Sequence, residues 1–184
     1  MTNWVESGRQ YARDVISGTI PACKWIKLAC ERTERDHERH DGAYRFDASR
    51  ASAPCEFISE FKFVQDSIKT MAGEPFRLLP WQLWILTTVF GWLWRDTGNR
   101  RYRRSYIEVG RGNGKSTLSA GVTQYIAFGE GVRGAQCICA ASEMSEPAEI
   151  ARLSMKAIVI GTFAFKIASR IFVAASTRPP KVLT

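Results

Sequence analysis

The sequence has few of the residues that build metal centres and disulfide-bonded folds. It contains two histidines and five cysteines, and no Cys-x-x-Cys pair occurs. An odd number of cysteines without that spacing disfavours disulfides and zinc, and it predicts buried, reduced thiols. His37 and His40 lie one helical turn apart, but no further ligands at fixed spacing accompany them. A metal site is therefore not expected there.

Long apolar runs are also lacking. No segment has the ~20 apolar residues that span a membrane, and the N-terminus has no signal-peptide core. These absences predict a soluble cytoplasmic protein with no membrane partner. A hydrophobic fraction of 45% in 184 residues is typical of a folded globular chain.

The charge balance is strongly basic, with a formal net charge of +8. A polyanionic partner such as nucleic acid explains this excess, and so does a solvated basic surface without a partner. Charge alone does not separate the two interpretations.

Residues 1–75 are predicted to form an N-terminal helical region. The pattern indicates a first helix before Gly18, and a second that starts near Pro21, in which Trp25, Leu28 and Ala29 recur at helical spacing. Asp47 is expected to cap a short helix, and Pro54 to start another.

Residues 76–184 are predicted to form a partial α/β domain. Pro80 starts a strongly apolar helix that runs to about Phe90. Strands are expected at residues 105–109, 135–141 and 171–175, with helices at about 114–128 and after Ser145. Strands that alternate with helices predict a parallel sheet with flanking helices.

A glycine-rich turn joins the first of these strands to its helix. Such a turn, when it ends in Gly-Lys-Ser/Thr, cradles nucleotide phosphates on backbone N–H groups at a helix N-terminus. Lys115 is expected to contact the β- and γ-phosphates, and Ser116 to place its hydroxyl on Mg²⁺. The usual first glycine falls at Val109, and the chain has glycine one residue later, at Gly110. The predicted nucleotide-binding residues in the loop are Gly110, Arg111, Gly112, Asn113, Gly114, Lys115, Ser116 and Thr117.

Four arginines precede the same strand, at Arg100, Arg101, Arg103 and Arg104, with Tyr102 among them. The cluster is suited to DNA phosphates, and the tyrosine to stacking on a base. A polar strand start with solvated arginines is the competing interpretation.

Taken together, these motifs resemble the large subunit of the tailed-phage DNA-packaging terminase at its N-terminal ATPase end. The irregular loop is similar to the family's Walker A, which carries a basic residue, here Arg111. The run Leu-Pro-Trp-Gln at residues 79–82 resembles its adenine-recognising glutamine motif, and Cys-Ala-Ala-Ser at 139–142 a later strand end. The resemblance covers about residues 8–158.

The resemblance implies a P-loop NTPase that uses ATP and Mg²⁺, with Gln82 as adenine reader and Arg111 contacting phosphate. It implies double-stranded viral DNA, a portal protein and a small terminase subunit as partners, and a homo-oligomeric ring in the full-length family. It also implies a phage- or prophage-encoded protein that acts in a bacterial cytoplasm.

One expected element of the family is not found. After Lys115 the acidic residues are Glu130, Glu143, Glu146 and Glu149, and none ends an apolar strand as the Asp-Glu pair of a Walker B motif. The catalytic residues are therefore unknown. We expect a truncated or split member that binds ATP but is deficient in hydrolysis alone.

Two other functions stay open at this point. One is a different nucleic-acid-dependent P-loop ATPase, such as a helicase-like protein, although the missing Walker B counts against it equally. The other is a non-enzymatic basic module for DNA binding or assembly.

Overall fold

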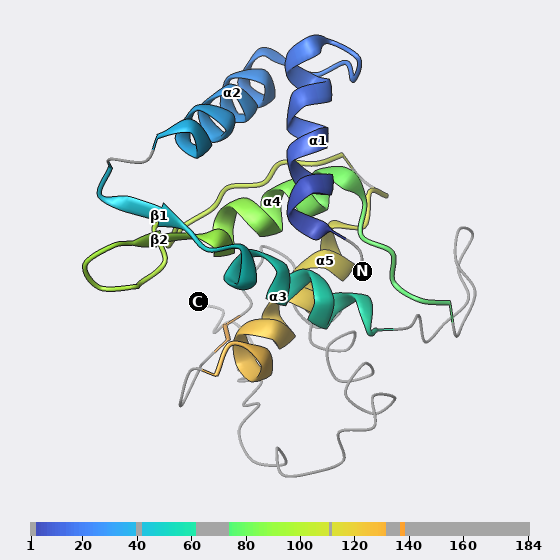
Figure 1. The fold of residues 1–184 in the computed structure, drawn as a ribbon. Coiled ribbons are helices and arrows are strands. Elements are labelled where there is room, and N and C mark those ends of the chain that lie inside the picture. The colour runs from blue at the N-terminus through green and yellow to red at the C-terminus, as the bar shows by residue number, and fades with distance from the viewer. Residues whose placement is uncertain (1–2, 40–41, 62–73, 111, 132–136, 139–184) are drawn as a thin grey trace, which may run out of the picture.

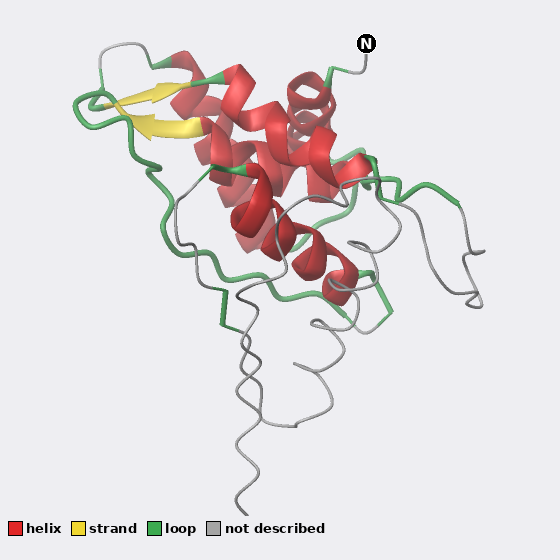
Figure 2. Cartoon of the chain, turned by 90° about the horizontal axis from the view of Figure 1, so that it is seen from below, coloured by secondary structure: helices red, strands yellow, loops and turns green. Residues whose placement is uncertain are grey.

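The computed structural model describes residues 3–39, 42–61, 74–110, 112–131 and 137–138. These residues form mainly helices, together with one pair of short strands (Figures 1 and 2). In chain order the elements are α1 (Trp4–Ser17), α2 (Lys24–Glu38), β1 (Tyr44–Phe46), α3 (Ala48–Ser59), α4 (Pro80–Gly91), β2 (Trp92–Trp94), α5 (Lys115–Gln124) and the π-helix η1 (Tyr125–Gly129).

Helix α1 has defined signals at both ends. The Asn3 side chain accepts a hydrogen bond from the Glu6 N–H at 3.0 Å, and Gly18 ends the helix in the left-handed conformation. Such caps satisfy backbone groups that the helix itself leaves unpaired. Helix α1 packs against both α2 and α4 (Figure 1). A two-point ion pair between Arg9 and Glu34, with distances of 3.2 and 2.7 Å, joins it to α2.

Helix α2 starts later than predicted. It begins at Lys24, not near Pro21, and Cys30 and Thr33 are its buried residues. Trp25 is 75% exposed and Leu28 is also exposed, so the apolar residues that recur at helical spacing do not mark its buried face. The helix packs against α1 (Figure 1).

Helix α3 is one continuous element, so the predicted break at Pro54 is also wrong. The Asp47 cap is confirmed, because its side chain accepts the Arg50 N–H at 3.0 Å. Pro54 is fully buried inside the helix. The packing around this residue compensates for the backbone hydrogen bond that proline cannot donate.

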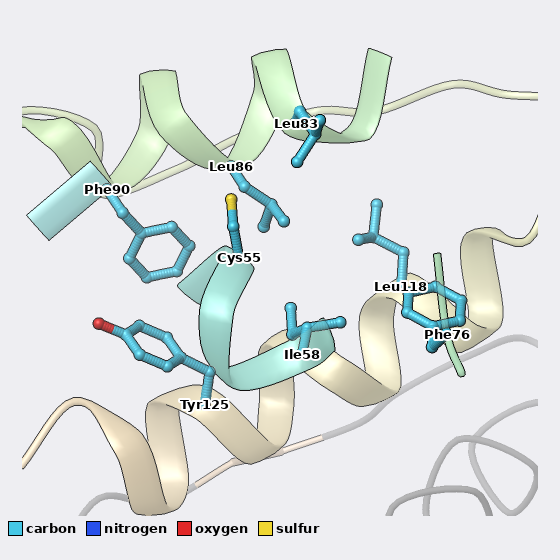
Figure 3. Packing of buried hydrophobic residues seen from close by; sticks show 8 residues of the cluster. All are labelled: Cys55, Ile58, Phe76, Leu83, Leu86, Phe90, Leu118 and Tyr125. Carbon is cyan, nitrogen blue, oxygen red and sulfur yellow. The ribbon is translucent and has the colours of Figure 1, made fainter. Parts of the chain in front are cut away.

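Helix α4 begins at Pro80, as the sequence predicts, and lies between its neighbours α1 and α3. Its apolar side chains point toward α3, α5 and η1, where they form the main core (Figure 3). The buried members of this cluster are Cys55, Ile58, Phe76, Leu83, Leu86, Phe90, Leu118 and Tyr125. Because the cluster draws on both sides of residue 75, residues of the two predicted regions share one core.

The thiol predictions are right for two residues. Cys30 and Cys55 are buried, whereas Cys23 and Cys137 are exposed. Burial raises the pKa of the Cys30 and Cys55 thiols to about 12, which keeps both protonated and unreactive.

The sheet is a two-stranded antiparallel pair, β1 with β2 (Figure 2). In its register Arg45 faces Leu93. The sequence did not predict either strand. No parallel sheet occurs in the described residues, and the strand predicted at residues 105–109 does not form there. A strand needs a partner for its backbone groups, and the predicted partners lie outside the described residues except for positions 137 and 138. No helix in the described ranges is long and apolar enough to cross a membrane.

Gly91 allows the closest approach of α4 to its neighbours. A Cβ atom at this position would lie 2.5 Å from the Phe46 ring and 2.8 Å from the Cβ of Ala51. We expect Gly91→Ala to lower the free energy of unfolding by about 1–3 kcal/mol, measured by urea denaturation, because the core must shift to admit a methyl group. Gly42→Ala is the control, since its nearest neighbour would be 3.9 Å away. Equal stability of the two variants would contradict the packing.

Candidate functional site

The glycine-rich loop at residues 109–117 lies at the start of α5. Gly112 and Gly114 have φ angles of +82° and +74°, and Gly114 is the residue from which the helix begins. Side chains rarely tolerate these angles, which explains glycine at both positions. The Asn113 side chain donates to the Gly110 carbonyl at 3.1 Å and closes the loop on itself. Arg111 lies outside the described residues.

The N-terminus of α5 is open to an anion. No side chain caps it, and its first turn contains no acidic residue. Lys115 and Ser116 are exposed at this end, and Thr117 is half-buried. Unpaired backbone N–H groups, the positive end of the helix dipole and a lysine therefore meet at one place. The chemistry of this set fits a phosphate group with its metal ion.

Gln82 belongs to a different helix, α4, and its side chain lies near the start of α5. It stands in the first turn of α4, where its Oε1 accepts the Leu79 N–H at 2.8 Å. Its Nε2 lies 3.6 Å from the position that a Cβ of Gly114 would take. The fold thus brings together the predicted adenine reader and the predicted phosphate loop.

The segment that enters the loop is exposed. Tyr106 is 88% exposed and Ile107 is 43% exposed. Glu108 is exposed too, and its carboxylate accepts the Tyr106 hydroxyl at 3.3 Å.

The four arginines before the loop fall into two pairs. Arg100 contacts Glu130 at 3.3 Å and lies over the Phe90 ring at 5.0 Å. Arg101 pairs with Asp36 at 2.7 Å and lies 4.2 Å from the centre of the Tyr44 ring. These two arginines hold the segment against the fold.

Arg103 and Arg104 are exposed. Tyr102 is half-buried, with the Arg101 guanidinium 5.0 Å from its ring, and desolvation raises its pKa. The arginines that the structure presents to solvent in this cluster are therefore the later two.

Glu130 is the described acidic residue that follows the loop. It comes directly after η1, so the length of α5 and η1 places it roughly 20 Å from the loop. Its side chain is 7% exposed and pairs with Arg100. Sequence reasoning missed this pair, because residues thirty positions apart carry no local signal of contact. Glu143, Glu146 and Glu149 lie outside the described residues.

His37 is part of an aromatic cluster. Its ring lies edge-on to Phe46 at 4.5 Å and tilted to Trp92 at 5.1 Å. Groups of three or more metal-ligating side chains do not occur among the described residues, and His40 is outside them. The histidine thus joins α2 to the sheet by packing.

The comparison with protein families gives one match. The family model described as "Terminase large subunit, ATPase domain" matches residues 80–159. The matched stretch starts with α4 and includes Gln82, the loop and α5. No curated protein and no solved structure matches the chain. The resemblance to the ATPase part of the terminase large subunit is confirmed over these residues.

The packing of His37 predicts a pH dependence of stability. Burial, and then the charge of Arg9, lower the pKa of His37 below its ordinary value of 6.5, although Glu34 and Asp36 act in the opposite direction. The unfolded chain therefore binds a proton more readily than the folded one. The free energy of unfolding should fall as the pH drops from about 7 through 6.5 toward the folded-state pKa.

The measurement is urea unfolding at pH 7 and pH 5 for the parent chain and for His37→Gln. The variant loses the titrating ring, so its stability should change less between the two pH values, whatever its absolute stability. An unchanged pH dependence in the variant would exclude His37 as the cause.

Proposed function

Because residues 80–159 match the ATPase domain of the terminase large subunit, we propose that this chain is the ATP-binding part of such a motor. The observation that carries the proposal is the uncapped start of α5, where Gly112 and Gly114 adopt left-handed angles beside exposed Lys115. Gln82 faces this loop from α4. A phosphate site and a group able to read a base are thus adjacent.

We assign each residue a role according to its chemistry. The backbone N–H groups of residues 112–117 bind the phosphates, and Lys115 neutralises the β- and γ-phosphate charge. Ser116 supplies its hydroxyl to Mg²⁺, which when bound withdraws charge from the phosphate oxygens. Asn113 keeps the loop closed through Gly110. Arg111 adds a positive charge to the loop, and Gln82 recognises adenine with its carboxamide.

We propose that ATP turnover by residues 1–184 alone is slow. Hydrolysis needs a carboxylate that orients the attacking water. Of the acidic residues beside or after the loop that the structure describes, Glu130 is too distant and is paired with Arg100, and Glu108 lies on the segment before the loop. Nucleotide affinity is therefore the more direct measure of function for this chain.

Double-stranded DNA is the proposed track of the motor. ATP binding and hydrolysis in the assembled enzyme would drive DNA into a procapsid, with a portal protein, a small subunit and a ring of like subunits as partners. The exposed Arg103 and Arg104 are the best-placed described members of the arginine cluster for phosphate contact.

Lys115→Ala tests the phosphate site. We expect Mg-ATP affinity to fall roughly 10- to 100-fold, because a charge-assisted contact to the phosphates is lost. Isothermal titration calorimetry measures the change. Lys27→Ala is the matched control, since it removes an exposed lysine from α2, and it should bind as the parent does. No affinity in the parent, or equal affinity in Lys115→Ala, would refute nucleotide binding at this loop.

The double variant Arg103→Ala/Arg104→Ala tests the DNA contact. Its affinity for duplex DNA should fall. The slope of the logarithm of the binding constant against the logarithm of the salt concentration should become shallower by about 2, because binding with two phosphate contacts fewer releases fewer counterions. Fluorescence anisotropy at several salt concentrations gives both values. Lys24→Ala/Lys27→Ala has the same net charge and should keep the parent slope. If the two double variants behave alike, the arginines have no specific role in DNA binding.

A further inference from the structure

The Gln82 side chain is polar, almost fully buried, and close to the loop proposed to bind phosphate. It is 2% exposed. Buried amides are held by hydrogen bonds, because an unsatisfied one costs free energy. Within the described residues its hydrogen bond is the one that Oε1 accepts from the Leu79 N–H, at 2.8 Å. That bond fixes which way the carboxamide points.

With Oε1 turned to the start of α4, the amide nitrogen faces the loop. Nε2 lies 3.6 Å from the point that a Cβ of Gly114 would occupy, so a side chain at this position would touch the carboxamide. Gly114 is the last loop residue before α5, and its left-handed φ of +74° sets the direction of the following N–H groups. Gln82 therefore lies beside the residue whose conformation aims the phosphate donors.

The support behind Gln82 is rigid. The next residue, Leu83, belongs to the main core, together with Leu86 of α4 and Leu118 of α5 (Figure 3). Helices α4 and α5 are thus joined through this core, and Gln82 lies close to Gly114. Two elements that share a packed core keep their relative position, and with it the place of Gln82 beside the loop.

We propose that Gln82 is a positioning residue for the triphosphate: its carboxamide, oriented by the Leu79 N–H, supports the loop at Gly114 whatever base the nucleotide carries. The inference rests on the proposed function, since it concerns the same nucleotide site. This role is additional to adenine recognition, which by itself would leave the affinity for a base-free triphosphate unchanged.

Gln82→Met separates these roles, because methionine has a similar length but no polar group. Affinities for Mg-ATP, Mg-GTP and magnesium tripolyphosphate, which has no base, are measured by calorimetry on the full chain. We expect tripolyphosphate affinity to fall roughly three- to tenfold, as for the loss of one hydrogen-bonded support, and Mg-GTP and Mg-ATP affinities to fall by at least this factor. Thermal unfolding of each sample checks that the protein stays folded.

Two results would overturn the proposal. If affinity falls for Mg-ATP and tripolyphosphate binding is unchanged, Gln82 reads the base alone. If all three affinities equal those of the parent while the melting temperature falls, Gln82 is only a helix cap. In both cases the parent still binds Mg-ATP, so the outcome is distinct from a failure of the proposed function, in which the parent itself does not bind.

Leu79→Pro tests the same support without changing Gln82. The backbone at Leu79 has φ −75°, which proline adopts, and the substitution removes the N–H that orients the carboxamide. We expect tripolyphosphate affinity to fall in this variant as well, by a smaller factor than in Gln82→Met. A folded Leu79→Pro protein that binds tripolyphosphate as tightly as the parent would contradict the orienting role of this bond.

Discussion

The structure depends on the enclosure of α4. This helix has apolar side chains on nearly all sides, and such a helix is stable only when other elements cover it. Helices α1 and α3 pack against it, and α5 joins through the shared core (Figures 1 and 3). Burial of a side chain such as Leu86 or Phe90 contributes on the order of 2 kcal/mol. The same enclosure fixes the first turn of α4 and, with it, Gln82.

The glycine-rich loop at residues 109–117 contrasts with the buried helix α4. Its residues contribute little to the core, since Gly112, Asn113 and Lys115 are exposed. Two glycines in left-handed conformations have a cost in backbone entropy, and the open N–H groups of α5 are not satisfied by a side chain. The proposed phosphate site would account for these features together, because a bound anion satisfies the N–H groups that folding leaves open.

The arginine cluster shows that residues of one type, close together in the sequence, can differ in burial and in partners. Arg100 and Arg101 find carboxylates and aromatic rings from other parts of the chain, at Glu130 and Phe90 and at Asp36 and Tyr44. When an ion pair is largely buried, removing one partner destabilises the fold, because the remaining charge is left unpaired and poorly solvated. The next two arginines, Arg103 and Arg104, stay in solvent.

The sequence by itself determined the features with local causes. The Asp47 cap, the start of α4 at Pro80 and the glycine loop that opens α5 depend on neighbouring residues, and all were predictable. Only tertiary structure decided which face of α2 is buried, that Pro54 stays within α3, and that β1 pairs with β2. These outcomes depend on contacts between distant residues, as does the meeting of Gln82 with Gly114. A sequence pattern states which side chains prefer to be buried, but the packing of whole helices decides which of them are.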